Sequence, residues 1–263
     1  MTPLVLVDAF AEAPFEGNPA AVCLLEDERP AGWMQALAAE LNQSETAFVR
    51  RQSGGCFALR WFTPAVEEEL CGHATLAAAH VLWESGVVPR NDEIHFDTRS
   101  GSLSAHTAED GIALDFPTEP ATETEAPADL AAVLGARVVA YGRSRLDHLV
   151  ELEHETEVVS LAPDLARLAG LTGRGVIVTA RADRPGFDFV SRFFAPSEGI
   201  PEDPVTGSAH CTLAPWWHER LGRRDLVGRQ LSKRGGTVRV RHWDSRTILL
   251  GSAVTVMRGV LAT

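Results

Sequence analysis

The sequence has little positive charge and no long apolar run. Its 263 residues include 24 Lys or Arg against 36 Asp or Glu, so the net charge is −12 at pH 7. Nucleic acids and anionic membranes select basic surfaces, so we expect neither as a partner. No apolar stretch approaches the roughly 18 residues of a membrane span. The opening residues, MTPLVLVDAF, lack the basic segment of a secretory signal. We therefore expect a cytoplasmic protein.

Cysteine is also scarce, and its spacing excludes the common cysteine-based sites. The four cysteines are Cys23, Cys56, Cys71 and Cys211. They form no C-x-x-C pair and match no zinc-binding pattern. The sequence therefore predicts free thiols in a reducing compartment, and no metal site.

The chain is long enough for two domains, and its patterns favour an α+β fold. Domains commonly hold 100–150 residues. The segment PTEPATETEAPAD, residues 117–129, is acidic, rich in proline and free of large apolar side chains, which predicts a linker. Each half reads as several strands, one apolar helix and further strands, rather than as alternating strands and helices. We expect one lobe at 1–117 with a helix at about 72–85. The second lobe would be 118–263 with a helix at about 207–221, unless the last strands pack on the first lobe.

An internal repeat supports this division. The run from Arg60 to Pro64, RWFTP, corresponds to RFFAP from Arg192 to Pro196. In both halves an acidic loop follows, and a glycine then opens an alanine-rich helix. The repeat predicts a duplication into two similar lobes, with a cleft between related elements.

The two glycines, Gly72 and Gly207, indicate where a ligand would bind. The first turn of a helix has unpaired N–H groups and the positive end of the helix dipole, which together attract anions. Glycine lets the ligand approach the backbone closely. We therefore expect a small carboxylate-bearing substrate. The side chains expected to surround it are Cys71, His73, Asp203 and Ser208.

Four segments in the same order resemble the PhzF family, named for phenazine biosynthesis. They are VDAFAEAPFEGNPAAV, NQSETAFV, RWFTPAVEEELCGHATLA and DPVTGSAH. The resemblance runs from about residue 4 to the end of the chain. It implies a diaminopimelate-epimerase-like fold of two pseudo-symmetric lobes, each a curved sheet or half-barrel wrapped round a central helix. It also implies a homodimer that uses no metal and no organic cofactor.

The resemblance also implies roles for individual residues. Glu45 matches the acid/base that moves a proton between carbons of a conjugated carboxylic acid. His73 and Asp203 match residues that orient the substrate and assist the transfer. Ser208, with Gly72 and Gly207, matches the substrate-binding helix ends. The family label does not fix the substrate.

Two other functions stay open from the sequence. An amino-acid or hydroxy-acid epimerase would use Cys71 as an acid/base, but the corresponding position of the second half, Asp203-Pro204-Val205, has no cysteine. In the isomerase interpretation Cys71 is a small neutral wall of the site. The third possibility is a binding protein without catalysis.

Arg60 and Arg192 either hold a carboxylate or form salt bridges at a sheet edge.

Overall fold

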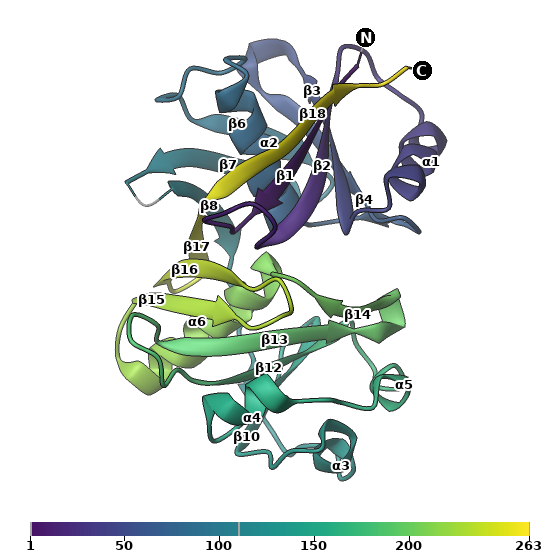
Figure 1. Ribbon diagram of the computed structural model, residues 1–263. Helices are drawn as coiled ribbons and strands as arrows, with labels where there is room; N and C mark the ends of the chain where they lie inside the picture. Colours follow the sequence, from purple (N-terminus) through teal and green to yellow (C-terminus); the bar gives the residue numbers. More distant parts are fainter. Residues whose placement is uncertain (1, 110, 263) are drawn as a thin grey trace. The chain divides into compact units, whose positions relative to one another are not determined.

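The chain forms two compact units in the computed structural model, which describes residues 2–109 and 111–262. Unit 1 comprises Met1–Phe116 and Leu249–Thr263, and unit 2 comprises Pro117–Ile248 (Figure 1). The sequence placed the last strands in a second lobe, 118–263, or alternatively on the first lobe. In the structure β18 (Ala253–Val260) pairs antiparallel with β1 (Pro3–Ala9), so the end of the chain completes unit 1.

Unit 1 contains a mixed sheet in the strand order β18, β1, β2, β3, β4, β6, β7, β8. Neighbouring strands are antiparallel except for the pairs β2–β3 and β4–β6, which are parallel. A two-residue strand, β5 (Glu67–Glu68), pairs with β4. The other bounds are β2 (Asn18–Leu25), β3 (Glu45–Arg51), β4 (Phe57–Phe62), β6 (Ile94–Thr98), β7 (Gly101–Ala108) and β8 (Gly111–Pro117).

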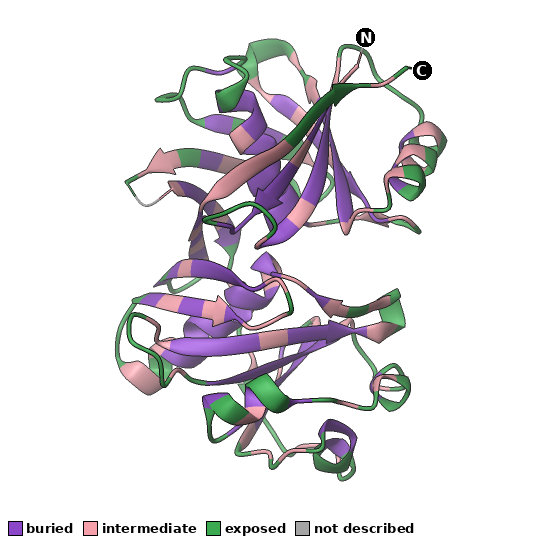
Figure 2. Ribbon diagram, viewed as in Figure 1, coloured by how far each residue is buried: buried purple, intermediate pink, exposed green. Residues whose placement is uncertain are grey.

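The sheet of unit 1 packs around helix α2 (Gly72–Glu84), which contacts β1, β2, β3 and β18. Eleven of its residues are buried, and Figure 2 shows it buried over most of its length. A helix that is apolar on all sides belongs in a core, and its alanines let the strands approach closely. The outer helix α1 (Ala31–Leu41) is amphipathic instead, and it packs Met34 and Ala38 against Phe48.

Unit 2 has a sheet in the order β9, β10, β11, β12, β13, β15, β16, in which β11–β12 and β13–β15 are parallel. A short strand, β14 (Ile200–Asp203), also pairs with β13. The bounds are β9 (Thr122–Glu123), β10 (Ala140–Arg143), β11 (Asp147–Glu151), β12 (Gly175–Arg181), β13 (Phe189–Ala195), β15 (Asp225–Gln230) and β16 (Gly236–Trp243). The strand β17 (Arg246–Gly251) begins in unit 2 and ends in unit 1.

Helix α6 (Gly207–Leu221) packs on β15 and β16 of unit 2 and is buried along most of its length. It ends at Gly222, whose left-handed backbone closes the helix. Three short helices cover the other side of the unit 2 core: α3 (Leu130–Leu134), α4 (Glu155–Ser160) and α5 (Leu165–Leu168).

The repeat seen in the sequence has the same topology in both units. In unit 1 the chain runs from β4 through α2 to β6, and in unit 2 from β13 through α6 to β15; each connection joins a parallel pair. Arg60 pairs with Glu67 and lies 5.2 Å from the ring of Phe62. Arg192 pairs with Glu202 and lies 4.9 Å from the ring of Phe194. Both arginines thus form salt bridges that fasten the loop before each helix. The α+β class of the fold is confirmed.

The sequence prediction of a linker needs correction. The linker predicted at 117–129 contains β9, which pairs with β10, so the middle of this segment is part of the sheet of unit 2. The helix α5 starts only at Leu165, because Pro163 and the N-cap Asp164, which accepts from Arg167 N–H, delay its start. Among the described residues, no helix is long and apolar enough to span a membrane.

Candidate active site

Glu45 is the first residue of β3, a strand flanked by β2 and β4 in the sheet of unit 1. Its backbone position is set by pairing with Ala20 of β2. The residue is 9% exposed, which is low for a carboxylate. Charged side chains are rarely buried to this degree without a partner.

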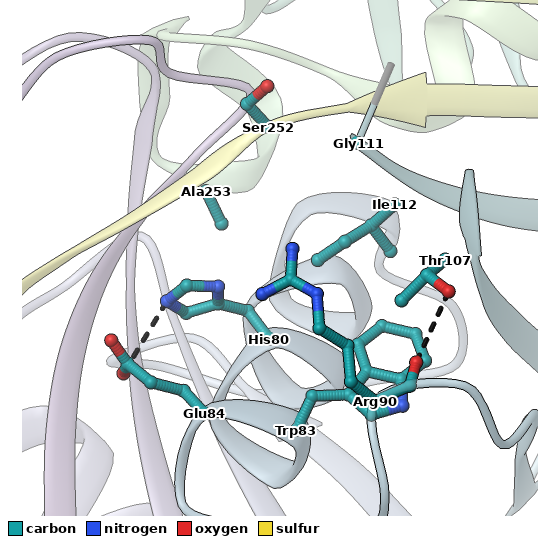
Figure 3. Close-up of a pocket in the computed structure, with 9 residues that line it drawn as sticks. All are labelled: His80, Trp83, Glu84, Arg90, Thr107, Gly111, Ile112, Ser252 and Ala253. Atoms are coloured by element: carbon teal, nitrogen blue, oxygen red, sulfur yellow. Dashed lines mark hydrogen bonds and ion pairs between the residues drawn. The ribbon is translucent and has the colours of Figure 1, made fainter. Parts of the chain in front are cut away.

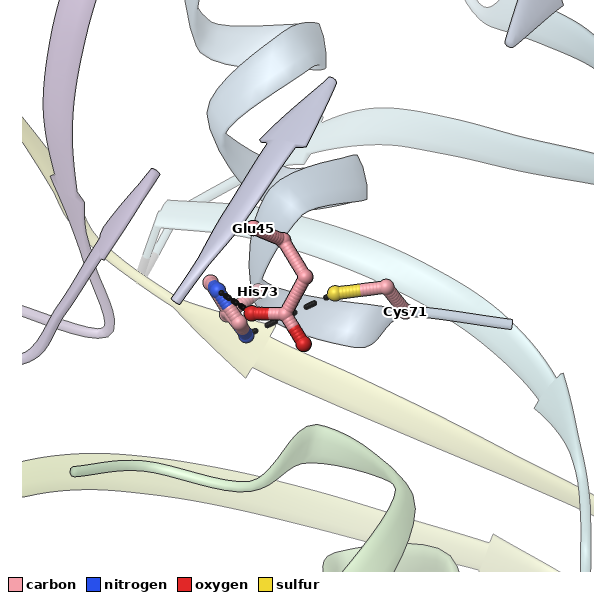
Figure 4. A group of neighbouring side chains, drawn as sticks. All are labelled: Glu45, Cys71 and His73. Carbon is pink, nitrogen blue, oxygen red and sulfur yellow. Dashed lines mark hydrogen bonds and ion pairs between the residues drawn. The ribbon is translucent and has the colours of Figure 1, made fainter. Parts of the chain in front are cut away.

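The partner of Glu45 is His73, the second residue of α2. His73 Nε2 lies 2.9 Å from Glu45 Oε2, and the imidazole is also buried (Figure 4). The distance is that of an ion pair, but the two groups are not aligned as a hydrogen bond. Among the described residues, neither Oε2 nor Nε2 has an aligned hydrogen-bond partner. Both atoms thus keep hydrogen-bonding capacity that a reacting group can use.

The other nitrogen of His73 is held by Asn18. Asn18 Nδ2 lies 3.2 Å from His73 Nδ1, and Asn18 is fully buried at the start of β2. Gly17 makes this placement possible, because its φ is +65° and a Cβ there would lie 2.2 Å from the Ala9 oxygen. No pattern in the sequence singled out Asn18 as a site residue. The available signal was that Asn18 lies within one of the family-like segments.

Cys71 completes the group, with its Sγ 3.5 Å from His73 Nδ1. Burial, reinforced by the charge of Glu45, raises the pKa of Cys71 to about 11, and His73 offsets this only in part. The thiol is therefore neutral at pH 7. A neutral thiol is a weak nucleophile and a poor base.

In contrast to Cys71, His73 has a pKa shift that favours its charged form. Burial alone lowers its pKa, but the sulfur of Cys71 and the carboxylate of Glu45 outweigh burial and raise the pKa of His73 well above its usual value. Because Cys71 is protonated at pH 7, the charge that favours imidazolium comes from Glu45. The pair is therefore a buried carboxylate beside a histidine that readily takes a proton.

Within the part of the chain that the structure describes, these three residues are the one group whose donor atoms lie close enough together to be considered as metal ligands. The ligand atoms of Glu45, Cys71 and His73 lie within 4.8 Å of one another. However, the sulfur approaches Nδ1 of the imidazole while the carboxylate approaches Nε2. Three donors must converge on one point to bind an ion, and these contact opposite nitrogens of one ring. The arrangement suits proton transfer better than coordination.

The backbone adds to the electrostatics of this group. Cys71 is the N-cap of α2, and Gly72 is its first residue. The positive end of the helix dipole therefore lies beside Glu45 and His73, where it stabilises negative charge. Thr75 Oγ1 donates to the Cys71 carbonyl at 2.5 Å, which fixes the entry to the helix.

In unit 2, Asp203 lies at the end of β14 and is 7% exposed. Its Oδ2 accepts a short hydrogen bond from the Thr206 hydroxyl. Gln230 donates to the Asp203 carbonyl at 2.8 Å and accepts from Thr206 N–H at 2.9 Å. Asp203 is thus fastened at the N-terminus of α6, next to Gly207.

Ser208, the second residue of α6, also has a fixed environment. Its Oγ accepts from Arg174 Nη1 at 2.9 Å. Arg174 in turn makes a bidentate pair with the buried Asp147, at 3.0 and 2.6 Å. Because Arg174 supplies the donor, the Ser208 hydroxyl can direct its own proton elsewhere. Neither Arg174 nor Asp147 had a recognisable signal in the sequence.

The predicted site residues therefore form two groups. Glu45, Cys71, Gly72 and His73 lie together in unit 1. Asp203, Gly207 and Ser208 lie together in unit 2. Each group surrounds the N-terminus of the central helix of its unit.

Comparison with known proteins identifies the family. The family model described as phenazine biosynthesis-like protein matches residues 7–259. An uncharacterized isomerase from Halalkalibacterium halodurans is 46% identical over 261 residues, covering 99% of this chain and 98% of that protein. A crystal structure of a PhzF-family phenazine biosynthesis protein from Enterococcus faecalis matches with a TM-score of 0.93 and 42% identity, covering 98% of both chains.

A more distant solved structure has a similar fold. A probable proline racemase from Agrobacterium radiobacter matches with a TM-score of 0.69 at 12% identity, over all of this chain and 93% of the other. At this identity the match shows a shared fold alone. The family model and the two close relatives show the family itself. The chain belongs to the phenazine biosynthesis-like, or PhzF, family of isomerases.

Proposed function

We propose that this protein is a cofactor-independent isomerase that moves a proton between carbons of a small, conjugated carboxylic acid. Glu45 removes the proton from an activated carbon and returns it to another carbon of the same conjugated system. His73 orients Glu45 and stabilises its carboxylate before it takes the proton and after it returns it. The proposed substrate is defined by class: it has a carboxylate and a conjugated system that can delocalise a carbanion.

The observation that carries this proposal is the buried contact between Glu45 and His73. Their facing atoms lie 2.9 Å apart without the alignment of a hydrogen bond. A general base must reach the proton it abstracts at hydrogen-bonding distance. Since Glu45 Oε2 is not committed to an aligned hydrogen bond, it is the oxygen that we expect to accept the proton.

The surroundings of Glu45 favour the negative charge that develops on the substrate. The imidazole of His73 and the N-terminus of α2 both contribute positive potential on this side of the carboxylate. Oriented dipoles act strongly in a buried site because little water screens them and they need not reorganise during the reaction. We expect the carboxylate or the enolate-like form of the substrate to lie at Gly72, where no side chain blocks the backbone.

Asn18 acts in this proposal as a positioning residue for His73. A carboxamide has both a donor and an acceptor, so it can pair with Nδ1 whether or not that nitrogen carries a proton. It therefore keeps the ring oriented while His73 changes its protonation state. This arrangement suits a histidine that works beside a proton carrier.

The epimerase alternative, with Cys71 as the base, has less support. Two-base chemistry at one stereocentre needs a thiolate at one step, and the pKa of Cys71, about 11, keeps the thiol protonated. An epimerase of this kind would also need a second thiol at the start of α6, and the residues there are Asp203 and Ser208. We therefore assign Cys71 to the wall of the site.

From unit 2 we propose that Asp203, Gly207 and Ser208 bind the substrate, as their family resemblance implies. The hydrogen bonds from Thr206 to Asp203 and from Arg174 to Ser208 fix both side chains at the start of α6.

A homodimer in the cytoplasm is a further prediction. Sedimentation equilibrium of the purified protein tests the dimer.

The experiment is turnover of trans-2,3-dihydro-3-hydroxyanthranilic acid, a conjugated carboxylic acid of this class, by the wild type and two variants. Glu45→Gln keeps the shape of the side chain but cannot accept the proton. Glu67→Gln is the matched control, because Glu67 lies in the same unit and pairs with Arg60. We expect the first variant to be inactive and the control to be active. If Glu45→Gln is as fast as the wild type, Glu45 is not the base. If the wild type binds this acid without converting it, the binding-protein alternative holds for this ligand.

A further inference from the structure

Unit 1 has a polar cavity whose lining does not include Glu45, Cys71 or His73. It has a volume of about 370 Å³ and lies beside the last turns of α2, bounded by β7, β8 and the start of β18 (Figure 3). Binding sites for small molecules begin at about this size. The side chains that decide its chemistry are His80, Trp83, Glu84 and Arg90.

Arg90 gives the cavity a positive charge. Among the described residues, no carboxylate lies within ion-pair distance of its guanidinium. The nearby Glu84 is already engaged, since it pairs with Arg258 at 2.7 Å and accepts from the Thr255 hydroxyl at 2.6 Å. Arg90 is therefore the cation of this cavity that remains available to an anion, in a protein whose net charge is −12.

His80 provides a hydrogen-bond acceptor, and the hydrogen bonds around it determine which nitrogen this is. His80 Nε2 lies 3.0 Å from Thr255 Oγ1. Because the Thr255 proton is donated to Glu84, the Thr255 oxygen must accept from His80, so Nε2 carries the proton. Nδ1 then has the lone pair, and Figure 3 shows this side of the ring toward Arg90.

The protonation state of His80 agrees with this assignment. Burial lowers the pKa of His80, and the nearby Arg258 and Arg90 lower it further against the opposing effect of Glu84. The ring is therefore neutral at pH 7. It cannot supply a second positive charge to the cavity, and its Nδ1 stays an acceptor.

Trp83 provides an apolar surface in the same cavity. Its indole N–H donates to the Asp92 carbonyl at 3.1 Å, so the ring offers a ligand its carbon surface rather than a donor. Ile112 lines the cavity as a further apolar side chain (Figure 3). A flat apolar ligand can pack against these two residues.

We infer that this cavity is a second binding site, for a small planar carboxylic acid that also has a hydroxyl or amino group. The carboxylate pairs with Arg90, the ring packs on Trp83, and the hydroxyl or amino group donates to His80 Nδ1. A guanidinium recognises a carboxylate through two parallel hydrogen bonds. The inference does not depend on the role of Glu45.

Isothermal titration calorimetry with benzoate and 3-hydroxybenzoate tests this site. We expect both acids to bind and the hydroxylated acid to bind more tightly. Arg90→Gln should weaken both by at least about tenfold, because the bidentate pair is lost. The matched control is Arg51→Gln, which removes the same charge from an exposed arginine at the end of β3. It should leave both affinities unchanged.

Two further measurements separate this site from the catalytic group. The same titration on Glu45→Gln should give wild-type affinities, since the acids do not need that carboxylate. In nitrogen-15 spectra, 3-hydroxybenzoate should shift the His80 Nδ1 resonance and benzoate should not. The inference is wrong if neither acid binds at about 10 mM, if Arg90→Gln binds as tightly as the wild type, or if Glu45→Gln abolishes binding.

Discussion

Replacing Asn18 with alanine tests whether His73 must be held in a fixed orientation. Asn18 is fully buried, and its Nδ2 lies 3.2 Å from His73 Nδ1. The substitution removes this partner from a buried ring nitrogen without adding a new group. Losing one partner of a buried hydrogen bond costs about 1–3 kcal/mol. We expect a cost of this size in the free energy of unfolding.

The same substitution should have a larger relative effect on catalysis than on binding. If the loss of this orientation raises the activation free energy by roughly 1.4–2.7 kcal/mol, kcat falls by about 10- to 100-fold. We expect KM to change little, because the contact is to His73. The assay is steady-state turnover of the probe acid, combined with denaturant unfolding of the same samples.

The control for this experiment is a buried hydrogen bond outside the candidate site. Thr179 Oγ1 in unit 2 is fully buried, donates to the Val190 carbonyl at 2.6 Å and accepts from Trp217 Nε1 at 3.0 Å. Thr179→Val should lose at least as much stability as Asn18→Ala and keep its kcat. Our reasoning is refuted if Asn18→Ala keeps the wild-type kcat, or if both variants lose activity in proportion to stability.

Three further predictions concern the same group of residues. Cys71→Ser should keep its turnover within about threefold of the wild type, because a thiol with a pKa of about 11 takes no part as a base; a loss comparable to that of Glu45→Gln in the turnover assay would support the epimerase alternative. Gly17→Ala should lower the free energy of unfolding by more than about 2 kcal/mol, because the new Cβ would lie 2.2 Å from the Ala9 oxygen at a φ of +65°; an unchanged denaturation midpoint would contradict this. The pKa of His73 is raised in the folded protein, so its stabilising effect is fully present below its unfolded value of 6.5 and is lost as pH rises through the folded value. The difference in unfolding free energy between the wild type and His73→Gln should therefore be largest in acid and shrink with rising pH, and a difference that grows with pH would show the sign to be wrong.

The central helices were predictable from the sequence because local signals mark both of their ends. The helices predicted at about 72–85 and 207–221 are α2 (Gly72–Glu84) and α6 (Gly207–Leu221). Each begins at a glycine, continues through small apolar residues and ends beside another glycine. The repeat of strand, acidic loop and helix also has a local signature, which is why the shared topology could be expected.

The contacts that fix the site residues were not predictable in the same way. Asn18 and His73 are 55 residues apart, and Arg174 and Ser208 are 34 apart. Such pairs form only when strands and helices pack, so no local pattern reports them. The helix α4 (Glu155–Ser160) was missed for a different reason. It is short, and its capping box uses His154 in place of the usual Ser or Thr.

The most direct test of the central claim is the position of deuterium in the product after turnover in heavy water. If Glu45 carries a proton between two carbons, the product has deuterium, at least in part, at a carbon other than the one that lost its hydrogen. Glu45→Gln should form no such product. Deuterium only at the carbon that lost its hydrogen would indicate an epimerase, and product formation by Glu45→Gln with the wild-type labelling pattern would contradict the assignment of Glu45 as the proton carrier.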